Sequence, residues 1–366
     1  MQENPRFLTD QLITYIGNKR SLLQFIGNGL DEVRARLGKT KLRCFDVFSG
    51  SGVVSRFLKQ YSSLLVANDL ENYAEVINRC YLTNPENINL HQLQSLHTSI
   101  IEQINTEGLD GGLISELYAP NDDTHIDPGE RVFYTTRNAR FLDTARKRIT
   151  GVPPEWQPYF LAPLLAEASV HANTSGVFKG FYKNSDTGIG KYGGKGGDAL
   201  LRIRGDISLP LPIFSNFSCE TLIIKGDANE VCGTVPEVDV AYLDPPYNQH
   251  PYGSNYFMLN LLLGYEKPST VSPISGIPSD WNRSVYNRKK NALSALTALI
   301  EKIKAKFLII SFNSEGFIGL EEMKRLLARY GKLDILETKY NTFRGSRNLS
   351  DRSMHVKEYL YLLEKK

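Results

Sequence analysis

The chain has 366 residues, of which 41% are hydrophobic and 23% charged, and its formal net charge is +3. This composition is ordinary for a globular protein, and the length allows two domains or one domain with a large insertion. No apolar run is long enough to cross a bilayer, and the first residues lack the pattern of a signal peptide, so we expect a cytoplasmic protein. Four scattered cysteines without a CxxC pair predict neither a zinc site nor a disulfide framework, and we expect no metal.

The predicted elements at the start of the chain alternate between helix and strand. Apolar residues at helical spacing predict a helix over residues 18–38, which Gly38 ends. The run LRCFDVFSGSG (42–52) predicts a short strand that breaks into a Gly-rich turn, and a helix starts in VVSRFLKQY (53–61). A second strand and helix follow in residues 63–82. This alternation is the signature of a parallel sheet covered on both faces.

The alternation is lost between about residues 82 and 220 and then resumes. The intervening stretch mixes an acidic part, a helix-like run at 155–170 and a loop-like run at 180–198. Strand-like runs return at residues 219–228, 238–247, 305–313, 332–340 and 356–365, and the last two suit an antiparallel pair. We therefore predict one α/β domain made of residues 1–81 and 221–366, interrupted by an inserted domain over residues 82–220.

Charge is distributed unevenly within the predicted insertion. Residues 82–130 contain no Lys or Arg and nine Asp or Glu, whereas residues 131–204 contain twelve Lys or Arg and five Asp or Glu. A local basic surface on a nearly neutral protein favours a polyanionic partner. A solvated basic face without a partner is the alternative.

Glycines in the turn after the first strand allow a ligand to approach the backbone closely. The run FDVFSGSG contains Asp46, Phe48, Gly50 and Gly52 at the carboxyl end of a strand, where open α/β sheets bind ligands. Neither a dinucleotide-binding GxGxxG pattern nor a P-loop is complete here. Asp69 ends the second strand, where a carboxylate can accept hydrogen bonds from both ribose hydroxyls. S-adenosylmethionine, a nucleoside without a pyrophosphate, fits this combination.

Two other segments carry candidate contacts to such a ligand. Tyr15, Gly17 and Lys19 precede the first helix, where a ring and an ammonium could engage the methionine part. A helix entry with surface charge is the alternative. Asp227 follows a strand and could meet an adenine edge, or it could cap a helix.

The run VAYLDPPY ends an apolar strand on Asp244, Pro245, Pro246 and Tyr247. An exocyclic amine on a base is a poor nucleophile because its lone pair is delocalised into the ring. Asp244 and the carbonyl of Pro245 can accept its two hydrogens, and the prolines hold that carbonyl rigidly. Tyr247 can stack on a base that has been swung out of a duplex. These four residues are our candidate catalytic residues.

Six runs in this order resemble the alpha-ordered N6-adenine DNA methyltransferases of bacterial restriction–modification and methylation systems. They are TYIGNKRSLLQFI, FDVFSGSG, VANDLEN, YLDPPYN, LIISFNSEGFI and the terminal EYLYLL. The resemblance covers most of residues 12–80 and 222–364. It implies a Rossmann-like methyltransferase sheet of seven strands with the last one reversed, and a target-recognition domain inserted before Asp244. It also implies S-adenosylmethionine as cofactor, double-stranded DNA as partner and a separate cognate restriction endonuclease.

The resemblance carries over to individual residues. It assigns cofactor contacts to Tyr15, Lys19, Asp69 and Asp244, with Phe48, Gly50 and Gly52 lining the pocket. Many relatives have Trp where this chain has Tyr15. We expect DNA contacts from basic residues of the insertion and from the loop at 341–353, namely Arg137, Arg140, Lys179, Lys183, Lys191, Lys195, Arg344 and Arg347.

Two other functions remain open at this point. An N4-cytosine methyltransferase can share the Asp-Pro-Pro-Tyr pattern and the same amine chemistry. C5-cytosine methylation is unsupported, because no cysteine follows a proline. From a different class, an inactive DNA-binding specificity subunit could keep the fold, although the intact motif argues against it.

Overall fold

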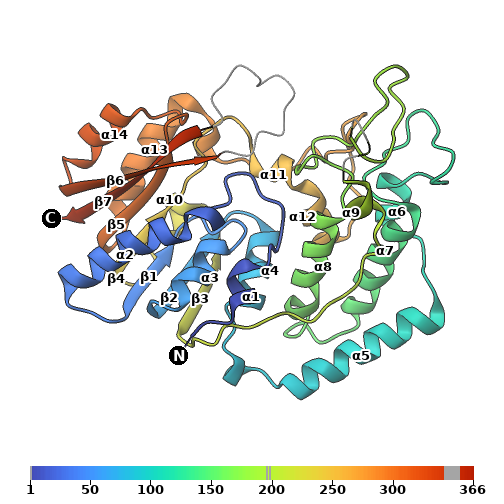
Figure 1. Cartoon of the computed structure of the whole chain (residues 1–366), viewed down its shortest axis with the longest axis horizontal. Coiled ribbons are helices and arrows are strands. Elements are labelled where there is room, and N and C mark those ends of the chain that lie inside the picture. The colour runs from blue at the N-terminus through green and yellow to red at the C-terminus, as the bar shows by residue number, and fades with distance from the viewer. Residues whose placement is uncertain (1, 195–196, 198, 342–354) are drawn as a thin grey trace.

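The computed structural model describes residues 2–194, 197, 199–341 and 355–366, and its centre is one seven-stranded sheet (Figure 1). The strands are β1 (Leu42–Asp46), β2 (Ser62–Asp69), β3 (Glu220–Lys225), β4 (Val238–Leu243), β5 (Ala305–Asn313), β6 (Gly331–Asn341) and β7 (His355–Lys365). Their order is β3-β2-β1-β4-β5-β7-β6. β1 to β5 run parallel, whereas β7 is antiparallel to both β5 and β6. The expected α/β sheet with a reversed last strand is therefore confirmed.

Helices cover both faces of this sheet. On one face, α2 (Leu23–Leu37) and α3 (Val53–Lys59) share a hydrophobic cluster with the strands. The other face packs against α10 (Ala228–Val231), α13 (Lys289–Lys302) and α14 (Leu320–Leu327). α2 ends as predicted at Gly38, whose φ of +62° is a left-handed cap. At Gly29 a Cβ would lie 2.7 Å from Leu360 Cδ2, so α2 lies close against β7.

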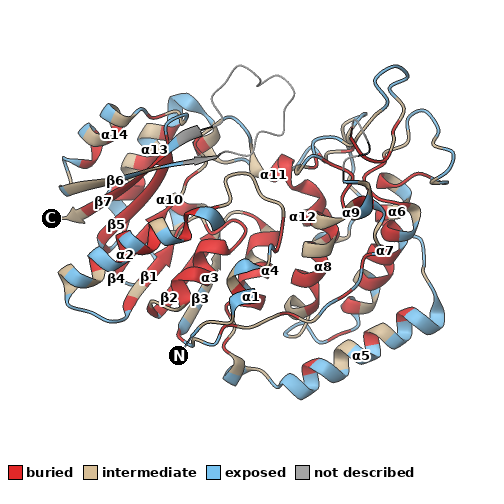
Figure 2. Cartoon of the chain, viewed as in Figure 1, coloured by how far each residue is buried: buried red, intermediate tan, exposed pale blue. Residues whose placement is uncertain are grey.

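The stretch between β2 and β3 is helical in the residues that the structure describes. Beside the sheet lie α5 (Leu90–Glu107), α6 (Leu113–Tyr118), α7 (Thr136–Thr150), α8 (Pro158–Val170) and α9 (Leu200–Arg204) (Figure 1). α8 confirms the predicted helix at 155–170. In the loop-like run, Lys183 and Gly190 form an isolated antiparallel bridge. α5 is mostly exposed (Figure 2), with Leu93, Ile100 and Ile104 buried on its inner side.

The remaining helices and 3₁₀ turns lie outside residues 82–220, apart from one turn at the start of that stretch. They are α1 (Pro5–Thr9), α4 (Asn72–Tyr81), α11 (Tyr252–Asn255), α12 (Phe257–Gly264) and the 3₁₀ turns Arg20–Leu22, Pro85–Asn87 and Val285–Asn287. α4 packs on β2 and β3 and also on α8 and α12. One buried cluster contains Ile77 of α4, Leu164 of α8 and Met258 of α12. α4 thus connects the sheet, which it contacts at β2 and β3, to the buried cluster of the inserted helices.

Candidate functional site

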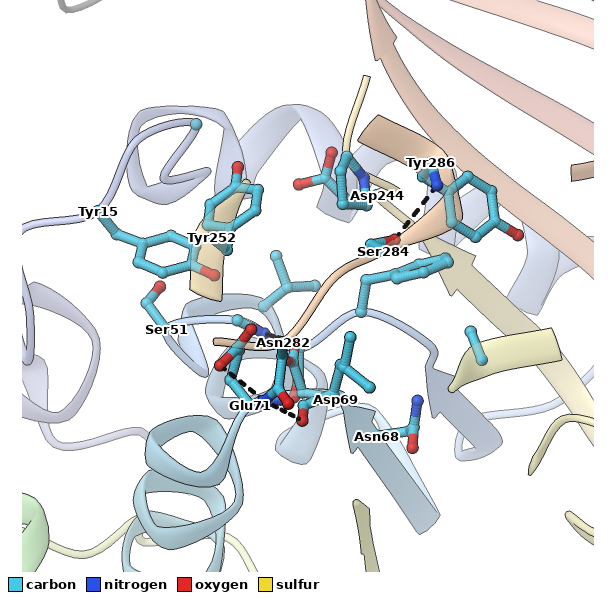
Figure 3. Close-up of a pocket in the computed structure, with 18 of the residues that line it drawn as sticks. Tyr15, Ser51, Asn68, Asp69, Glu71, Asp244, Tyr252, Asn282, Ser284 and Tyr286 are labelled. Carbon is cyan, nitrogen blue, oxygen red and sulfur yellow. Dashed lines mark hydrogen bonds between the residues drawn. The ribbon is translucent and has the colours of Figure 1, made fainter. Parts of the chain in front are cut away.

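A cavity opens at the carboxyl ends of β1, β2 and β4 (Figure 3). The empty space within it, counted together with the open space at its mouth, is about 870 Å³. Its lining includes nine of the predicted site residues, Tyr15, Gly17, Lys19, Phe48, Gly50, Asp69, Asp227, Asp244 and Pro246. Asp46, Gly52, Pro245 and Tyr247 are not part of that lining.

The Gly-rich turn holds Asp69 at the cavity wall. Gly50 adopts a φ of +52°, and a Cβ there would lie 2.9 Å from the Tyr15 ring. This close approach explains the glycine. The Gly50 N–H donates to Asp69 Oδ2 at 2.8 Å, and the Glu71 N–H donates to Asp69 Oδ1 at 2.9 Å. Burial raises the pKa of Asp69, while these backbone donors oppose the rise.

Asp46 lies behind the turn and supports it. Its side chain is fully buried, and its Oδ2 accepts a hydrogen bond from Ser55 Oγ at 2.6 Å. Burial raises its pKa to about 7. Gly52 caps α3 with a φ of +73°, and a Cβ there would lie 3.1 Å from Asn78 Oδ1. The structure therefore places both residues where they shape the turn.

Lys19 is turned toward the Asp-Pro-Pro-Tyr segment. Its ammonium is 2% exposed and lies 3.0 Å from Asp244 Oδ1 and 3.5 Å from Glu358 Oε1. It also lies 5.6 Å from the centre of the Tyr247 ring. Burial lowers the pKa of Lys19, but Asp244 and Glu358 more than offset this, and the pKa ends well above its ordinary value. Lys19 is therefore a cation between two carboxylates.

Asp244 sits at the end of β4 with a perturbed carboxyl group. Burial raises its pKa to about 6, Lys19 lowers it, and Glu358 adds to the rise. Tyr247 is 9% exposed and its ring meets Phe312 edge-on at 5.6 Å. The Tyr247 carbonyl accepts a hydrogen bond from the Phe317 N–H at 2.9 Å. The segment after β4 is thus tied to the turn after β5.

Aromatic side chains form two walls of the cavity. Phe48 meets Tyr286 edge-on at 5.2 Å, and both line the cavity next to Asp227. Asp227 caps α10 through a hydrogen bond from the Asn229 N–H at 2.8 Å, so it is a cap as well as a lining residue. On the other side, Tyr15 stacks on Tyr252 at 4.9 Å and on Tyr256 at 4.7 Å.

Sequence reasoning missed several residues of the site. Glu71, only 3% exposed, accepts a hydrogen bond from Asn260 Nδ2 at 2.6 Å. It accepts a second one from Asn282 Nδ2 at 3.1 Å, and Figure 3 shows these two side chains together. Burial raises its pKa to about 7. The only signal for Glu71 was its position two residues after Asp69. Four further lining residues come after the Asp-Pro-Pro-Tyr segment, in short helical turns or irregular chain too brief for a spacing pattern, namely Tyr252, Asn282, Ser284 and Tyr286.

Five of the predicted DNA-contacting residues lie in the described part of the insertion. Arg137 and Arg140 are exposed near the start of α7, and Arg137 pairs with Asp206 at 3.0 Å. Lys179 is exposed, and Lys183 and Lys191 are partly exposed. Lys195, Arg344 and Arg347 lie outside the described residues.

Part of the basic excess in residues 131–204 serves the fold. Arg146 Nε donates to the Leu262 carbonyl at 2.9 Å, and Arg202 Nη1 donates to the Ala172 carbonyl at 2.9 Å. Arg131 Nη2 donates to the Pro273 carbonyl at 3.3 Å. These guanidinium groups satisfy backbone carbonyls, so the charge count overstates the basic surface offered to a partner.

Comparison with known proteins decides the family. The model of the D12 class N6 adenine-specific DNA methyltransferases matches residues 15–273, more than two thirds of the chain. This protein belongs to that family. The resemblance seen in the sequence is thereby confirmed, and the D12 assignment names adenine N6 as the methylated position, not cytosine N4.

Relatives of this D12-class methyltransferase align along nearly the whole chain. The Type II methyltransferase M.NlaIII of Neisseria lactamica is 28% identical over 361 residues, 96% of this chain and 99% of that protein. The Type II methyltransferase M.CviAII of Paramecium bursaria Chlorella virus 1 is 26% identical, over 96% of this chain and 98% of that protein. Modification methylase StsI of Streptococcus sanguinis is 27% identical, but the match covers 52% of that protein.

The described residues of the methyltransferase lack two kinds of feature. Within them, no helix combines the length and apolar character required to span a bilayer. Among the same residues, no group of three or more His, Cys, Asp or Glu side chains is arranged to hold a metal ion.

Proposed function

We propose that this protein transfers the methyl group of S-adenosylmethionine to N6 of an adenine flipped out of double-stranded DNA, as the modification enzyme of a restriction–modification system. The observation that carries the proposal is the cavity at the strand ends, whose wall contains both Asp69 and Asp244. Family membership supports the adenine. Names of relatives such as the Type II methyltransferase M.NlaIII support the restriction–modification setting, in which a cognate endonuclease acts separately.

The cavity fits a nucleoside with an amino-acid arm. Phe48 and Tyr286 offer ring faces and edges to a base, and Asp227 offers a carboxylate beside them. Asp69 supplies acceptors for ribose hydroxyls, and the side-chain Oδ1 of the neighbouring Asn68 is buried without a hydrogen-bond partner in the described structure. Gly50 lets the backbone of the turn lie close against the Tyr15 ring, and both residues line the cavity. S-adenosylmethionine would supply an electrophilic methyl group on a sulfonium.

Asp244, Pro245 and Tyr247 would act on the base. The Asp244 carboxylate accepts one hydrogen of the adenine amine and the Pro245 carbonyl accepts the other, which localises the nitrogen lone pair. Tyr247 stacks on the flipped base, and its own ring is supported by Phe312. In the transfer, the amine lone pair would form the N–C bond while the S–C bond breaks and leaves its electron pair on sulfur, giving a thioether. The amine would then lose one proton, which the Asp244 carboxylate could accept. Because these residues would hold the base in place before the reaction, less entropy would be lost in reaching the transition state.

The remaining assignments are also proposals. We propose that residues 1–81 and 221–366 form the catalytic domain and residues 82–220 the target-recognition domain. Exposed Arg137, Arg140 and Lys179 on that insertion support a DNA-facing surface there.

Asp244 is the residue that tests the function. Asp244→Ala removes the anionic acceptor, so transfer should fall by roughly a hundredfold or more while DNA binding is kept. Asp244→Asn keeps an acceptor without the charge and should retain a small part of the activity. The test digests the methylated DNA to nucleosides and identifies the product by mass spectrometry. N4-methylcytosine would overturn the base assignment, full activity of Asp244→Ala would overturn the mechanism, and DNA binding without methylation by the parent chain would favour an inactive specificity subunit.

A further inference from the structure

A buried carboxylate that the proposed mechanism does not use lies behind Asp244. Glu358 of β7 is fully buried, and its Oε1 lies 3.5 Å from the Lys19 ammonium. Ser311 Oγ on β5 donates to the same oxygen at 2.5 Å. One ammonium therefore faces two carboxylates, those of Asp244 and Glu358.

The reversed direction of β7 explains how Glu358 reaches this place. Because β7 runs against β5, its first residues lie at the edge where the parallel strands end, and Glu358 pairs with Asn313. Leu360 and Leu362, which follow on the same face of β7, are buried among apolar side chains. On this face of β7, Glu358 thus comes directly before a row of apolar side chains.

The needs of the fold do not account for a carboxylate at this position. Burying a charged group is unfavourable unless it is paired and fully hydrogen-bonded. Within the described part of the chain, Glu358 Oε2 is buried without a hydrogen-bond partner. An apolar side chain would continue the row of Leu360 and Leu362 and avoid this cost. Glu358 therefore needs a reason outside the packing of the sheet.

We propose that Glu358 is a positioning residue, which holds the Lys19 ammonium beside Asp244 and leaves these three side chains with a net negative charge at the cavity. The inference rests on the proposed function. A sulfonium donor is a cation, and the positive charge moves from sulfur to the amine during transfer. Excess negative charge beside the cavity favours both centres. Without Glu358, Lys19 would neutralise Asp244 and weaken it as an acceptor.

The electrostatics of Asp244 agree with this arrangement. Burial is the main cause of its raised pKa, Lys19 opposes the rise, and Glu358 contributes to it. Ionisable groups that interact with Asp244 come from every neighbouring element, namely Lys19, Asp46, Tyr242, Tyr252 and Glu358. Removing the charge of Glu358 should therefore lower the pKa of Asp244.

The first experiment measures ligand binding in Glu358→Gln, which keeps the shape of the side chain and an acceptor for Ser311. Calorimetry compares S-adenosylmethionine with its uncharged thioether product, S-adenosylhomocysteine. The ratio of the two affinities should shift against the cation by roughly tenfold, the effect of one buried charge. Glu364→Gln, on the same strand but paired with Arg36 at the surface, is the matched control and should leave the ratio unchanged.

The second readout is the pH dependence of a single turnover. In Glu358→Gln, the fall of the rate on the acidic side of the pH profile (the acidic limb) should move to lower pH, and the maximal rate should decrease. A purely structural defect would lower the rate at every pH without moving the acidic limb. If Glu358→Gln does not fold, Ser311→Ala removes the hydroxyl that stabilises the Glu358 anion, and this loss should shift the binding ratio in the same direction. An unchanged ratio and limb in a folded variant would overturn the inference. Failure of the parent chain to bind S-adenosylmethionine would overturn the proposed function itself.

Discussion

Asp244 titrates in a range that makes activity depend on pH. Its pKa is raised to about 6, chiefly by burial, and the anion is the form that accepts the amine hydrogen. Activity should therefore be complete above that pKa and fall as the pH drops through it, by about tenfold per pH unit on the acidic side. Single-turnover rates between pH 5 and 8 check this. A rate that rises as the pH falls below 6 would show that the protonated carboxyl is the active form.

Asp69 and Tyr247 should separate cofactor binding from chemistry. Asp69→Ala removes a ribose contact present before and during transfer, so it should weaken S-adenosylmethionine binding by roughly tenfold or more. Tyr247→Ala should lower turnover and the binding of an extrahelical base while cofactor affinity is largely kept. Calorimetry with the cofactor alone and fluorescence of 2-aminopurine in the target duplex measure the two effects. Equal loss of cofactor affinity in both variants would contradict this division of roles.

Sequence reasoning found the residues of the site that directly follow predicted strands. Asp69 ends β2 and Asp244 follows β4, the strands on either side of β1, and parallel strands of one sheet end at the same edge, so their shared cavity followed from the pattern. Glu358 precedes the apolar run of β7, and Tyr286 lies in a 3₁₀ turn after an irregular stretch. Their places depend on strand reversal and on loop paths, which periodicity does not encode.

Among the elements, the turn around the Lys183–Gly190 bridge belongs to the basic surface that we expect to bind DNA. Replacing Lys179, Lys183 and Lys191 together with Gln should weaken DNA binding and flatten its salt dependence, by roughly one unit of slope per lost phosphate contact. Fluorescence anisotropy across a salt series measures the slope.

The control for this experiment makes the same change of charge elsewhere. Lys302, Lys304 and Lys306 are exposed around the amino end of β5, at the edge opposite the cavity. Their replacement with Gln should leave the slope unchanged. If the slope changes only with this second triplet, the DNA surface lies on the sheet edge and not on the insertion.

The helices and strands whose apolar residues repeat at a clear period were predicted from the sequence. The helices of the insertion were predicted only in part. The strands and the helix that Gly38 ends followed from apolar runs and a left-handed cap. α5 carries only three buried side chains over eighteen residues, so its apolar face is too sparse for a confident pattern. α12 is apolar on nearly all sides because it is enclosed between α4 and α8. An apolar run without periodicity does not show which elements it packs against.

For the whole molecule, the packing of α4 predicts cooperative unfolding. Because α4 packs on β2 and β3 and also shares a buried cluster with α8 and α12, the sheet and the insertion should unfold in a single transition. The variant Trp281→Phe leaves Trp156, beside the inserted helices, as the only tryptophan. Its fluorescence and the far-ultraviolet circular dichroism should change at the same denaturant concentration. Two separated midpoints would show that the insertion is an independently stable domain.

The position of β7 inside the sheet has a consequence for biosynthesis. Although β7 is translated after β6, it lies between β5 and β6 and bonds to both. A ribosome-bound chain that has emerged only as far as β6 therefore has no neighbour for that strand and leaves the flank of β5 open to wrong pairing. The Lys19 ammonium also lacks its contact with Glu358 until that residue has been translated, more than three hundred residues later. Newly made enzyme can thus modify DNA only once translation has passed the strand that closes the sheet.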